Sequence, residues 1–270
     1  MSPVQQAARL AERFRLDGRN ALVTGAGRGI GRAIAVGLAE AGANVCVTSR
    51  SADELAKTCE KISALGCRSA FVVADLLDPA GIAAIVPAMV GELGSVDILV
   101  NNAGQSGLKD PFPVVSMTDW ERHLRLLLTV HVALTQQAVR WMTGAGRPGV
   151  VVNVSSIYGL AGAPGGEKDL GSVSYYTAAK HGLVGFTRAL AIEVASAGIR
   201  VNALCPGWVD TAMNPISKAD PAFIQRNLDQ IPMGRWASAD EMAGPALFLA
   251  SDASSFMTGQ TLVVDGGHLA

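Results

Sequence analysis

Short apolar runs alternate with longer runs of helical periodicity from about residue 20 to the end of the chain. Each short run is almost continuously apolar, which is typical of a strand buried on both faces of a parallel sheet. The longer runs predict helices that cover both faces of that sheet. The predicted strands are residues 20–24, 44–49, 69–74, 97–100, 149–155, 199–205 and 261–265, and the predicted helices are residues 29–41, 53–65, 79–92, 117–142, 174–197 and 240–251. The alternation predicts an α/β fold with a doubly wound parallel sheet of about seven strands.

A chain of 270 residues without a linker or repeat suits one large α/β domain. We expect residues 16–270 to form it and residues 1–15 to be an N-terminal extension. The balance of 22 basic and 23 acidic residues excludes a strongly basic nucleic-acid binder and a polybasic membrane anchor. No stretch approaches the ~20 apolar residues of a membrane span, and the first residues lack the apolar core of a signal peptide. Four cysteines without a C-x-x-C pair predict free thiols and a cytoplasmic protein.

Two stretches interrupt the alternation, at residues 159–174 and 209–236. Both follow the carboxyl ends of predicted strands, where doubly wound sheets bind ligands. Each is a candidate for shaping a substrate pocket, with an ordinary surface loop as the equal alternative. Trp208, Met213 and Trp236 flank the second stretch, either as an apolar substrate wall or as part of the packed core.

A glycine-rich turn follows the first predicted strand and opens the first predicted helix. Gly25, Gly29, Ile30 and Gly31 belong to this turn. Such a turn lets backbone N–H groups approach a pyrophosphate at the helix N-terminus, where the helix dipole favours negative charge. The glycine string alone is weak evidence in a chain with 30 glycines, but its place in a strand–helix unit predicts a dinucleotide-binding site.

The end of the second predicted strand bears on which dinucleotide fits. Enzymes that prefer the unphosphorylated cofactor place an acid there, which binds the ribose 2′-hydroxyl. This chain has Ser49 at that place, followed by Arg50, and Arg28 lies in the glycine turn. Two arginines without an acid favour a 2′-phosphate, because guanidinium matches phosphate geometry. The pattern predicts NADP(H), with two solvated surface arginines as the alternative.

Further motifs follow the later predicted strands in order. They are Asp75-Leu76, Asn101-Asn102-Ala103-Gly104, Tyr176-Thr177-Ala178-Ala179-Lys180, Cys205-Pro206-Gly207 with Val209 and Thr211, and Asp265-Gly266-Gly267. With the glycine turn, they resemble the short-chain dehydrogenase/reductase family over nearly the whole chain. The resemblance implies a single-domain Rossmann-type fold and a homotetramer built on the fourth and fifth helices and the C-terminal strand. It implies cofactor contacts from Asp75, Leu76, Asn102, Ala103, Gly104, Pro206, Gly207, Val209 and Thr211.

Tyr176 and Lys180 are four residues apart on a predicted helix, so they share one face. A neighbouring ammonium favours phenolate and should lower the pKa of the phenol from ~10 toward working pH. The resemblance implies that Tyr176 exchanges a proton with the substrate oxygen and that Lys180 also holds the cofactor ribose. It also implies that Ser156 hydrogen-bonds the carbonyl oxygen. Ser155 is the neighbouring alternative, but the spacing to Gly159 favours Ser156.

These residues predict an NADP(H)-dependent oxidoreductase that acts on a small molecule and interconverts a ketone and a secondary alcohol. One alternative is a catalytically weakened member of the family that serves as a cofactor-binding scaffold. Another is a dehydratase or epimerase on the same fold. The four histidines are scattered without ligand spacing, so no metal site is predicted.

The chain departs from the family pattern in two places. The family usually carries an asparagine seven residues after a tryptophan like Trp120, and this asparagine helps to hold a water next to the lysine. Leu127 stands there instead, and leucine cannot form that hydrogen bond. Thr129 and His131 are nearby polar residues, but neither has the right spacing. The second departure is an insertion at residues 166–172, either a substrate lid or a passive surface insertion.

Overall fold

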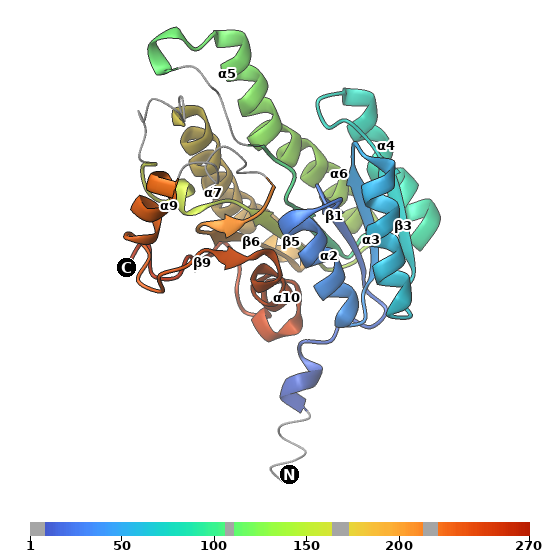
Figure 1. Ribbon diagram of the computed structural model, residues 1–270. Coiled ribbons are helices and arrows are strands. Elements are labelled where there is room, and N and C mark those ends of the chain that lie inside the picture. Colours follow the sequence, from blue (N-terminus) through green and yellow to red (C-terminus); the bar gives the residue numbers. More distant parts are fainter. Residues whose placement is uncertain (1–8, 106–110, 164–172, 213–220) are drawn as a thin grey trace.

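The computed structural model describes residues 9–105, 111–163, 173–212 and 221–270. Its centre is a parallel seven-stranded sheet in the order β3-β2-β1-β4-β5-β6-β9 (Figure 1). The strands are β1 (Asn20–Thr24), β2 (Asn44–Ser49), β3 (Ser69–Val73), β4 (Ile98–Asn101), β5 (Gly149–Val154), β6 (Ile199–Pro206) and β9 (Thr261–Val264). The predicted doubly wound sheet is confirmed, with strand ends displaced by at most one residue.

Helices cover both faces of the sheet, as the continuous apolar strands require. One face carries α2 (Gly29–Glu40), α3 (Ala52–Ala64) and α10 (Ala243–Ala250), and the other carries α4 (Pro79–Leu93), α6 (Val130–Gly144) and α7 (Ser174–Val194). Neighbouring residues of β1 serve different cores. Val23 packs with the first group and Leu22 with the second, and both are 0% exposed. A strand in which polar and apolar residues alternate would therefore leave the helices on one face of the sheet without apolar contacts.

The long helix predicted at residues 117–142 is interrupted. It consists of α5 (Met117–Leu124), a π-helical turn η2 (Arg125–Thr129) and α6. A π-helical turn holds one extra residue and rotates the faces of the helix that follows, and such turns are frequent at functional sites. Leu127 lies in this turn with 0% exposure and packs against Tyr175 and Ala179 of α7.

The stretch expected to be a loop after β6 contains regular structure. It holds a helix, α9 (Pro221–Leu228), and a short strand, β7 (Val209–Asp210), which pairs in parallel with β8 (Ala237–Ser238) just after the stretch. Short 3-10 turns complete the elements: η1 (Phe112–Val114), η3 (Ile157–Gly159), η4 (Ala195–Ala197), η5 (Ala239–Met242) and η6 (Asp252–Ser254). The insertion at residues 166–172 and Met213 lie outside the described residues.

The strand order reverses at β1, which pairs with β2 on one side and β4 on the other. The chain after β1 enters α2 on one face, and the chain after β4 leads through α5 to the opposite face. This divergence opens a crevice at the carboxyl ends of β1 and β4, the place where doubly wound sheets bind ligands.

The N-terminal residues 9–12 form a short helical turn that projects from the sheet in Figure 1. The chain joins the domain at Phe14, whose ring centroid lies 6.5 Å from that of Phe248 in α10. Leu16 is 3% exposed in the core. Among the helices of the described residues, none is both long enough and apolar enough to cross a membrane.

Candidate active site

The glycine turn between β1 and α2 is packed closely against the chain that follows β4. Gly25 has a φ of 64°, and a Cβ at this position would lie 2.9 Å from the Cα of Ala103. A Cβ on Gly31 would lie 2.4 Å from both the Gly25 carbonyl oxygen and Asn102 Nδ2. The N-cap residue Arg28 makes no side-chain capping hydrogen bond, so the N-terminus of α2 is suited to an anionic ligand.

Asn102 joins the two strands at the crevice. Thr24 Oγ1 accepts hydrogen bonds from the backbone N–H groups of Asn102 and Ala103, both at 2.9 Å. Asn102 Nδ2 donates to the Thr24 carbonyl oxygen at 2.9 Å. Gly104 follows, and a Cβ on it would lie 3.2 Å from Leu127 Cδ2. The motif after β4 therefore holds the floor of the crevice in place.

We expect Gly31→Ala to destabilise the protein, because the added Cβ meets the Gly25 carbonyl and Asn102 at 2.4 Å. Overpacking of this kind costs roughly 1–3 kcal/mol, or roughly 2–10 °C in Tm. Thermal unfolding measures it, with Gly91→Ala in α4 as the matched control, since a Cβ there meets nothing within 4 Å. Helix propensity alone should raise the stability of that control. Equal Tm values for Gly31→Ala and the unmodified chain would contradict the close packing.

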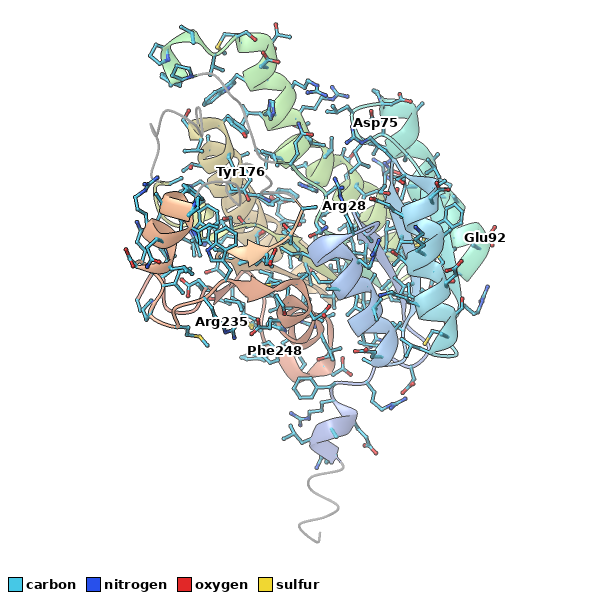
Figure 2. The ribbon with its side chains drawn as sticks, in the orientation of Figure 1. Arg28, Asp75, Glu92, Tyr176, Arg235 and Phe248 are labelled. Carbon is cyan, nitrogen blue, oxygen red and sulfur yellow. The ribbon has the colours of Figure 1, made fainter. Side chains whose placement is uncertain are left out.

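A cavity of about 370 Å³ opens beside the glycine turn. Of the residues expected at the cofactor, Gly25, Arg28, Ser49, Arg50, Asp75, Leu76, Ala103 and Gly104 line it. Figure 2 shows Arg28 and Asp75 at the end of the sheet opposite the N-terminal helical turn, with Tyr176 toward the same end. Arg122 and Leu126 also line the cavity. The sequence carried no signal for these two, because only the path of α5 and η2 brings them there.

Glu54 changes the electrostatics of this cavity. Its Oε1 lies 3.8 Å from Arg28 Nη1, and a Cβ on Gly27 would lie 2.8 Å from its Oε2. Glu54 therefore adds to the cavity an acid that the end of β2 does not carry. Ser51 caps α3 by accepting a hydrogen bond from the Glu54 N–H at 3.4 Å, which turns the first turn of α3 toward the cavity. Sequence reasoning missed this acid because Glu54 lies in the first turn of α3 and not at the end of β2.

The loop after β6 lies against the start of α2. Thr211 Cγ2 would be 3.5 Å from a Cβ on Gly29. Pro206 ends β6, and a Cβ on Gly207 would lie 2.8 Å from the Cα of Asp265. This packing carries the loop back over the crevice from the far side of the sheet.

Some of the residues expected at the cofactor also serve the core. Val209 is 4% exposed and Leu76 is 7% exposed. Ile30 is half-buried and packs against the core formed by α2, α3 and α10. Their apolar character is accounted for by packing whether or not they touch a ligand.

Ser156 and Tyr176 meet between the end of β5 and the start of α7. Ser156 is the N-cap residue of η3, and its Oγ accepts a hydrogen bond from the Tyr158 N–H at 3.2 Å. The Ser156 hydroxyl also lies near the hydroxyl of Tyr176, where it opposes the rise in the pKa of that phenol. Ser155 instead donates to the carbonyl oxygen of Lys180 at 3.1 Å. The structure therefore brings Ser156 to the phenol and turns Ser155 away from it.

Lys180 is buried beside this pair, with 4% exposure. Its Nζ donates to the Val154 carbonyl oxygen at 2.8 Å and lies 5.6 Å from the centroid of the Tyr176 ring. Burial lowers the pKa of Lys180 to about 8. Burial also raises the pKa of Tyr176 to about 12, against the opposing hydrogen bond from Ser156. The expectation that the ammonium lowers the pKa of this phenol is wrong for this structure, because burial outweighs the neighbouring groups.

An aromatic cluster begins two residues after Ser156. The ring of Trp208 stacks on Trp236 with centroids 5.4 Å apart. It makes edge contacts with Phe223 at 5.5 Å and Tyr158 at 6.4 Å. Trp208 and Trp236 therefore belong to one packed cluster that also reaches Tyr158, two residues after Ser156.

Known proteins match both the sequence and this geometry. The family model described as enoyl-(acyl carrier protein) reductase matches residues 25–268. A 2-dehydro-3-deoxy-D-gluconate 5-dehydrogenase of Dickeya dadantii is 38% identical over 257 residues, covering 95% of this chain and 98% of that protein. A gluconate 5-dehydrogenase from Burkholderia cenocepacia, crystallised with NADP and tartrate, superposes with a TM-score of 0.87 at 35% identity, covering 96% of this chain and 98% of that one.

A short-chain type dehydrogenase/reductase from Mycobacterium marinum superposes with a TM-score of 0.89 at 32% identity, covering 97% of this chain and 99% of that one. These matches extend over the glycine turn, the crevice and the Ser156–Tyr176 pair alike. The chain belongs to the short-chain dehydrogenase/reductase family.

Proposed function

We propose that this chain is an NADP(H)-dependent oxidoreductase that interconverts a ketone and a secondary alcohol, with Ser156, Tyr176 and Lys180 as its catalytic residues. The observation that carries the proposal is the placement of Ser156 near the Tyr176 hydroxyl, with the buried Lys180 Nζ 5.6 Å from the centroid of the Tyr176 ring. A phenol and a hydroxyl at one point can bind a carbonyl oxygen and exchange a proton with it.

The crevice fits a phosphorylated dinucleotide. The turn has no space for a Cβ at Gly31, and the N-terminus of α2 is suited to a pyrophosphate. Arg28 and Arg50 line the same cavity as Ser49, where guanidinium groups suit a 2′-phosphate. The relative from Burkholderia cenocepacia with bound NADP supports this choice. The other cofactor contacts that we propose are Gly25, Gly29, Ile30, Asp75, Leu76, Asn102, Ala103, Gly104, Pro206, Gly207, Val209 and Thr211.

NADPH, when bound, supplies the hydride for the carbonyl carbon. Tyr176 donates its hydroxyl proton to the carbonyl oxygen, and Ser156 holds that oxygen by a hydrogen bond. Lys180 uses one of its three N–H groups on the Val154 carbonyl oxygen and can turn the others toward the cofactor ribose. Alcohol oxidation uses the same groups in reverse.

The protonation of Tyr176 supports reduction as the working direction. Its pKa is raised to about 12 by burial, so the phenol keeps its proton throughout the neutral range. A general acid must hold its proton before the reaction, whereas a general base must have lost it. Oxidation therefore needs the phenolate form of Tyr176, which is scarce at neutral pH.

Arg50→Ser should lower kcat/KM with NADPH and leave kcat/KM with NADH nearly unchanged. A charge-assisted hydrogen bond contributes about 1.5–3 kcal/mol, which corresponds to about 10–100-fold in kcat/KM. Arg28→Ser should have a smaller effect, since Arg28 already lies 3.8 Å from Glu54. Initial rates with both cofactors measure the ratio.

The matched control for this prediction is Lys57→Ser. Lys57 is an exposed cation on α3, the helix that carries Glu54, and it does not line the cavity. An unchanged cofactor ratio in Arg50→Ser, or the same change in Lys57→Ser, would argue against phosphate recognition by Arg50.

A screen of ketones followed by NADPH absorbance tests the reaction itself. It should include 3-oxoacyl, sugar-derived and cyclic ketones, and the gluconate-related name of the Dickeya dadantii relative makes sugar acids the first class to try. NADPH binding without turnover of any ketone would favour a scaffold role. Conversion of a substrate without net NADPH consumption would favour a dehydratase or epimerase.

We also propose that the protein is a cytoplasmic homotetramer whose catalytic domain spans residues 16–270, with residues 1–15 as an extension. Apolar side chains on the predicted interface elements support the tetramer, since Ile192 of α7 is 82% exposed and Val263 of β9 is 38% exposed. The burial of Leu16 at 3% exposure supports the domain boundary. Light scattering of the purified protein tests the mass of four chains.

A further inference from the structure

His123 lies at the border between two faces of α5. Arg122 in α5 and Leu126 in η2 are four residues apart, and both line the cavity beside the glycine turn. The side chain of His123 points more than a quarter of a turn away from that of Arg122 around the helix. It is 4% exposed, and its ring makes an edge contact with Tyr175 of α7, with centroids 4.6 Å apart. His123 therefore joins the cavity side of α5 to its buried side.

A hydrogen bond within α5 determines the tautomer of His123. Its Nδ1 lies 2.7 Å from the carbonyl oxygen of Asp119, four residues earlier. A carbonyl oxygen can only accept, so Nδ1 carries the proton, and Nε2 of the neutral ring is an acceptor. Asp119 is itself held in place, because its N–H donates to Oγ of the N-cap residue Ser116 at 3.1 Å. The contact with Tyr175 and the bond to Asp119 therefore give the Nε2 lone pair a fixed direction.

Gln105 supplies the donor for this lone pair. It follows Gly104 in the chain after β4, is half-buried and lines the cavity. Its Nε2 lies 3.4 Å from Nε2 of His123. Only the NH₂ end of an amide can donate, so the acceptor on His123 determines which end of the Gln105 amide faces the helix. The amide oxygen Oε1 is then turned away from His123 and is available to a donor in the cavity.

The dinucleotide proposed for this cavity carries donors as well as phosphates. Its ribose hydroxyls and its carboxamide NH₂ can each donate a hydrogen bond. The guanidinium groups of Arg28 and Arg50 and the N–H groups at the N-terminus of α2 suit the phosphates, but they are donors themselves and cannot accept from these groups. An oriented amide oxygen on the wall formed by the chain after β4 complements them.

We propose that Gln105 is a further cofactor-binding residue and that His123 is its positioning residue. His123 Nε2 accepts from the Gln105 amide, so that Gln105 Oε1 accepts a hydrogen bond from a ribose hydroxyl or from the carboxamide of NADP(H). The inference rests on the proposed function, since it needs the dinucleotide in this cavity. It concerns binding alone, and no covalent bond is made or broken.

A double-mutant cycle followed by NADPH fluorescence titration tests the inference in the full chain. Gln105→Leu removes both ends of the amide and should raise the Kd for NADPH about two- to tenfold, the effect of one hydrogen bond. His123→Phe keeps a ring beside Tyr175 and removes both nitrogens. It should raise this Kd by a similar or smaller factor, because the amide is then free to turn. The double variant should bind NADPH no more weakly than Gln105→Leu, because His123 acts through Gln105.

A second ligand identifies the donor. The fragment 2′-phospho-ADP-ribose keeps both riboses and lacks the nicotinamide. If Gln105→Leu raises the Kd of this fragment as much as that of NADPH, a ribose hydroxyl is the donor, whereas a rise for NADPH alone assigns the carboxamide. At saturating NADPH, kcat for ketone reduction should change less than about twofold in Gln105→Leu, because the lost interaction serves binding.

Matched controls exist for both side chains. Gln137 is a half-buried glutamine of α6 that donates from Nε2 to the Ile82 carbonyl oxygen at 3.3 Å and does not line the cavity. His181 of α7 has its Nδ1 3.0 Å from the carbonyl oxygen of Thr177, four residues earlier, and also lies outside the cavity lining. Gln137→Leu and His181→Phe should leave the Kd for NADPH unchanged.

Three results would each overturn the inference: additive effects of Gln105→Leu and His123→Phe, an unchanged Kd in Gln105→Leu, or the same rise in Gln137→Leu. If His123→Phe does not fold, His123→Leu is measured in its place. NADPH binding without turnover of any ketone would count against the proposed reaction and not against this inference. Absence of NADPH binding by the unmodified protein would overturn both.

Discussion

Tyr176→Phe is expected to lower kcat/KM for ketone reduction by about 10³-fold while the protein stays folded and binds NADPH. The substitution removes one hydroxyl and leaves the ring, which packs beside Leu127, Tyr175 and Ala179. A positioned acid or base contributes ~10²–10⁴-fold, and Tyr176 is the phenol that lies near Ser156. Initial rates and NADPH fluorescence titration separate the loss of chemistry from any loss of binding.

The matched control is Tyr175→Phe. Tyr175 is the preceding residue on α7, with 1% exposure and its ring 4.6 Å from that of His123. It removes the same atom from the neighbouring position and should change kcat/KM only a few-fold. Comparable losses in the two variants, or a loss below tenfold in Tyr176→Phe, would assign the acid to another group.

The raised pKa of Tyr176 also sets the pH profile. Because the phenol is protonated up to a pKa of about 12, reduction should vary little with its ionisation near neutrality. Oxidation needs the phenolate, so its kcat/KM should increase as the pH rises toward that value. Tyr176→Phe should lose this increase.

The inner strands were predictable because they are buried on two faces, whereas the edge strands β3 and β9 are partly exposed. Leu22 and Val23 serve opposite cores, so every residue of β1 had to be apolar or paired, and the run stood out from its surroundings. The glycine turn between β1 and α2 was predictable for a related reason. Gly25 needs a positive φ and Gly31 needs the space of a missing Cβ, and both requirements are visible in the residue type itself.

The features that sequence reasoning missed depend on tertiary packing. Glu54 reaches the cavity because Ser51 caps α3 there, which no local pattern at the end of β2 reveals. The π-helical turn η2 keeps the same apolar residues as an α-helix would, so periodicity predicted one uninterrupted helix. The pKa of Tyr176 follows from burial, which the four-residue spacing to Lys180 does not report.

Lys180→Met should separate activity from stability. The lysine is 4% exposed, and burial lowers its pKa from 10.5 to about 8. Keeping a charged lysine at this site therefore costs about 3 kcal/mol below pH 8. Methionine removes that cost, but the Val154 carbonyl oxygen loses its partner, which costs about 1 kcal/mol. At pH 7 we expect a gain of about 2 kcal/mol, or roughly 4–8 °C in Tm, together with a loss of about 10²-fold or more in kcat/KM.

The pH dependence decides whether the buried charge is the cause. Between pH 8 and 10.5 the unfolded chain holds the lysine proton more tightly than the folded chain, so the stability of the unmodified protein should rise across this window. Below pH 8 both states are protonated, and above 10.5 neither is, so Lys180 adds no slope there. Lys180→Met should lack the rise, and its advantage at pH 7 should vanish by pH 10.5. Denaturant unfolding across these pH values measures both. A stability advantage of Lys180→Met that stays constant with pH would come from apolar packing alone. If the variant is less stable than the unmodified protein at pH 7, the hydrogen bond to Val154 outweighs the desolvation of the ammonium. Either result would contradict the expected cost of keeping a charged lysine at this buried site.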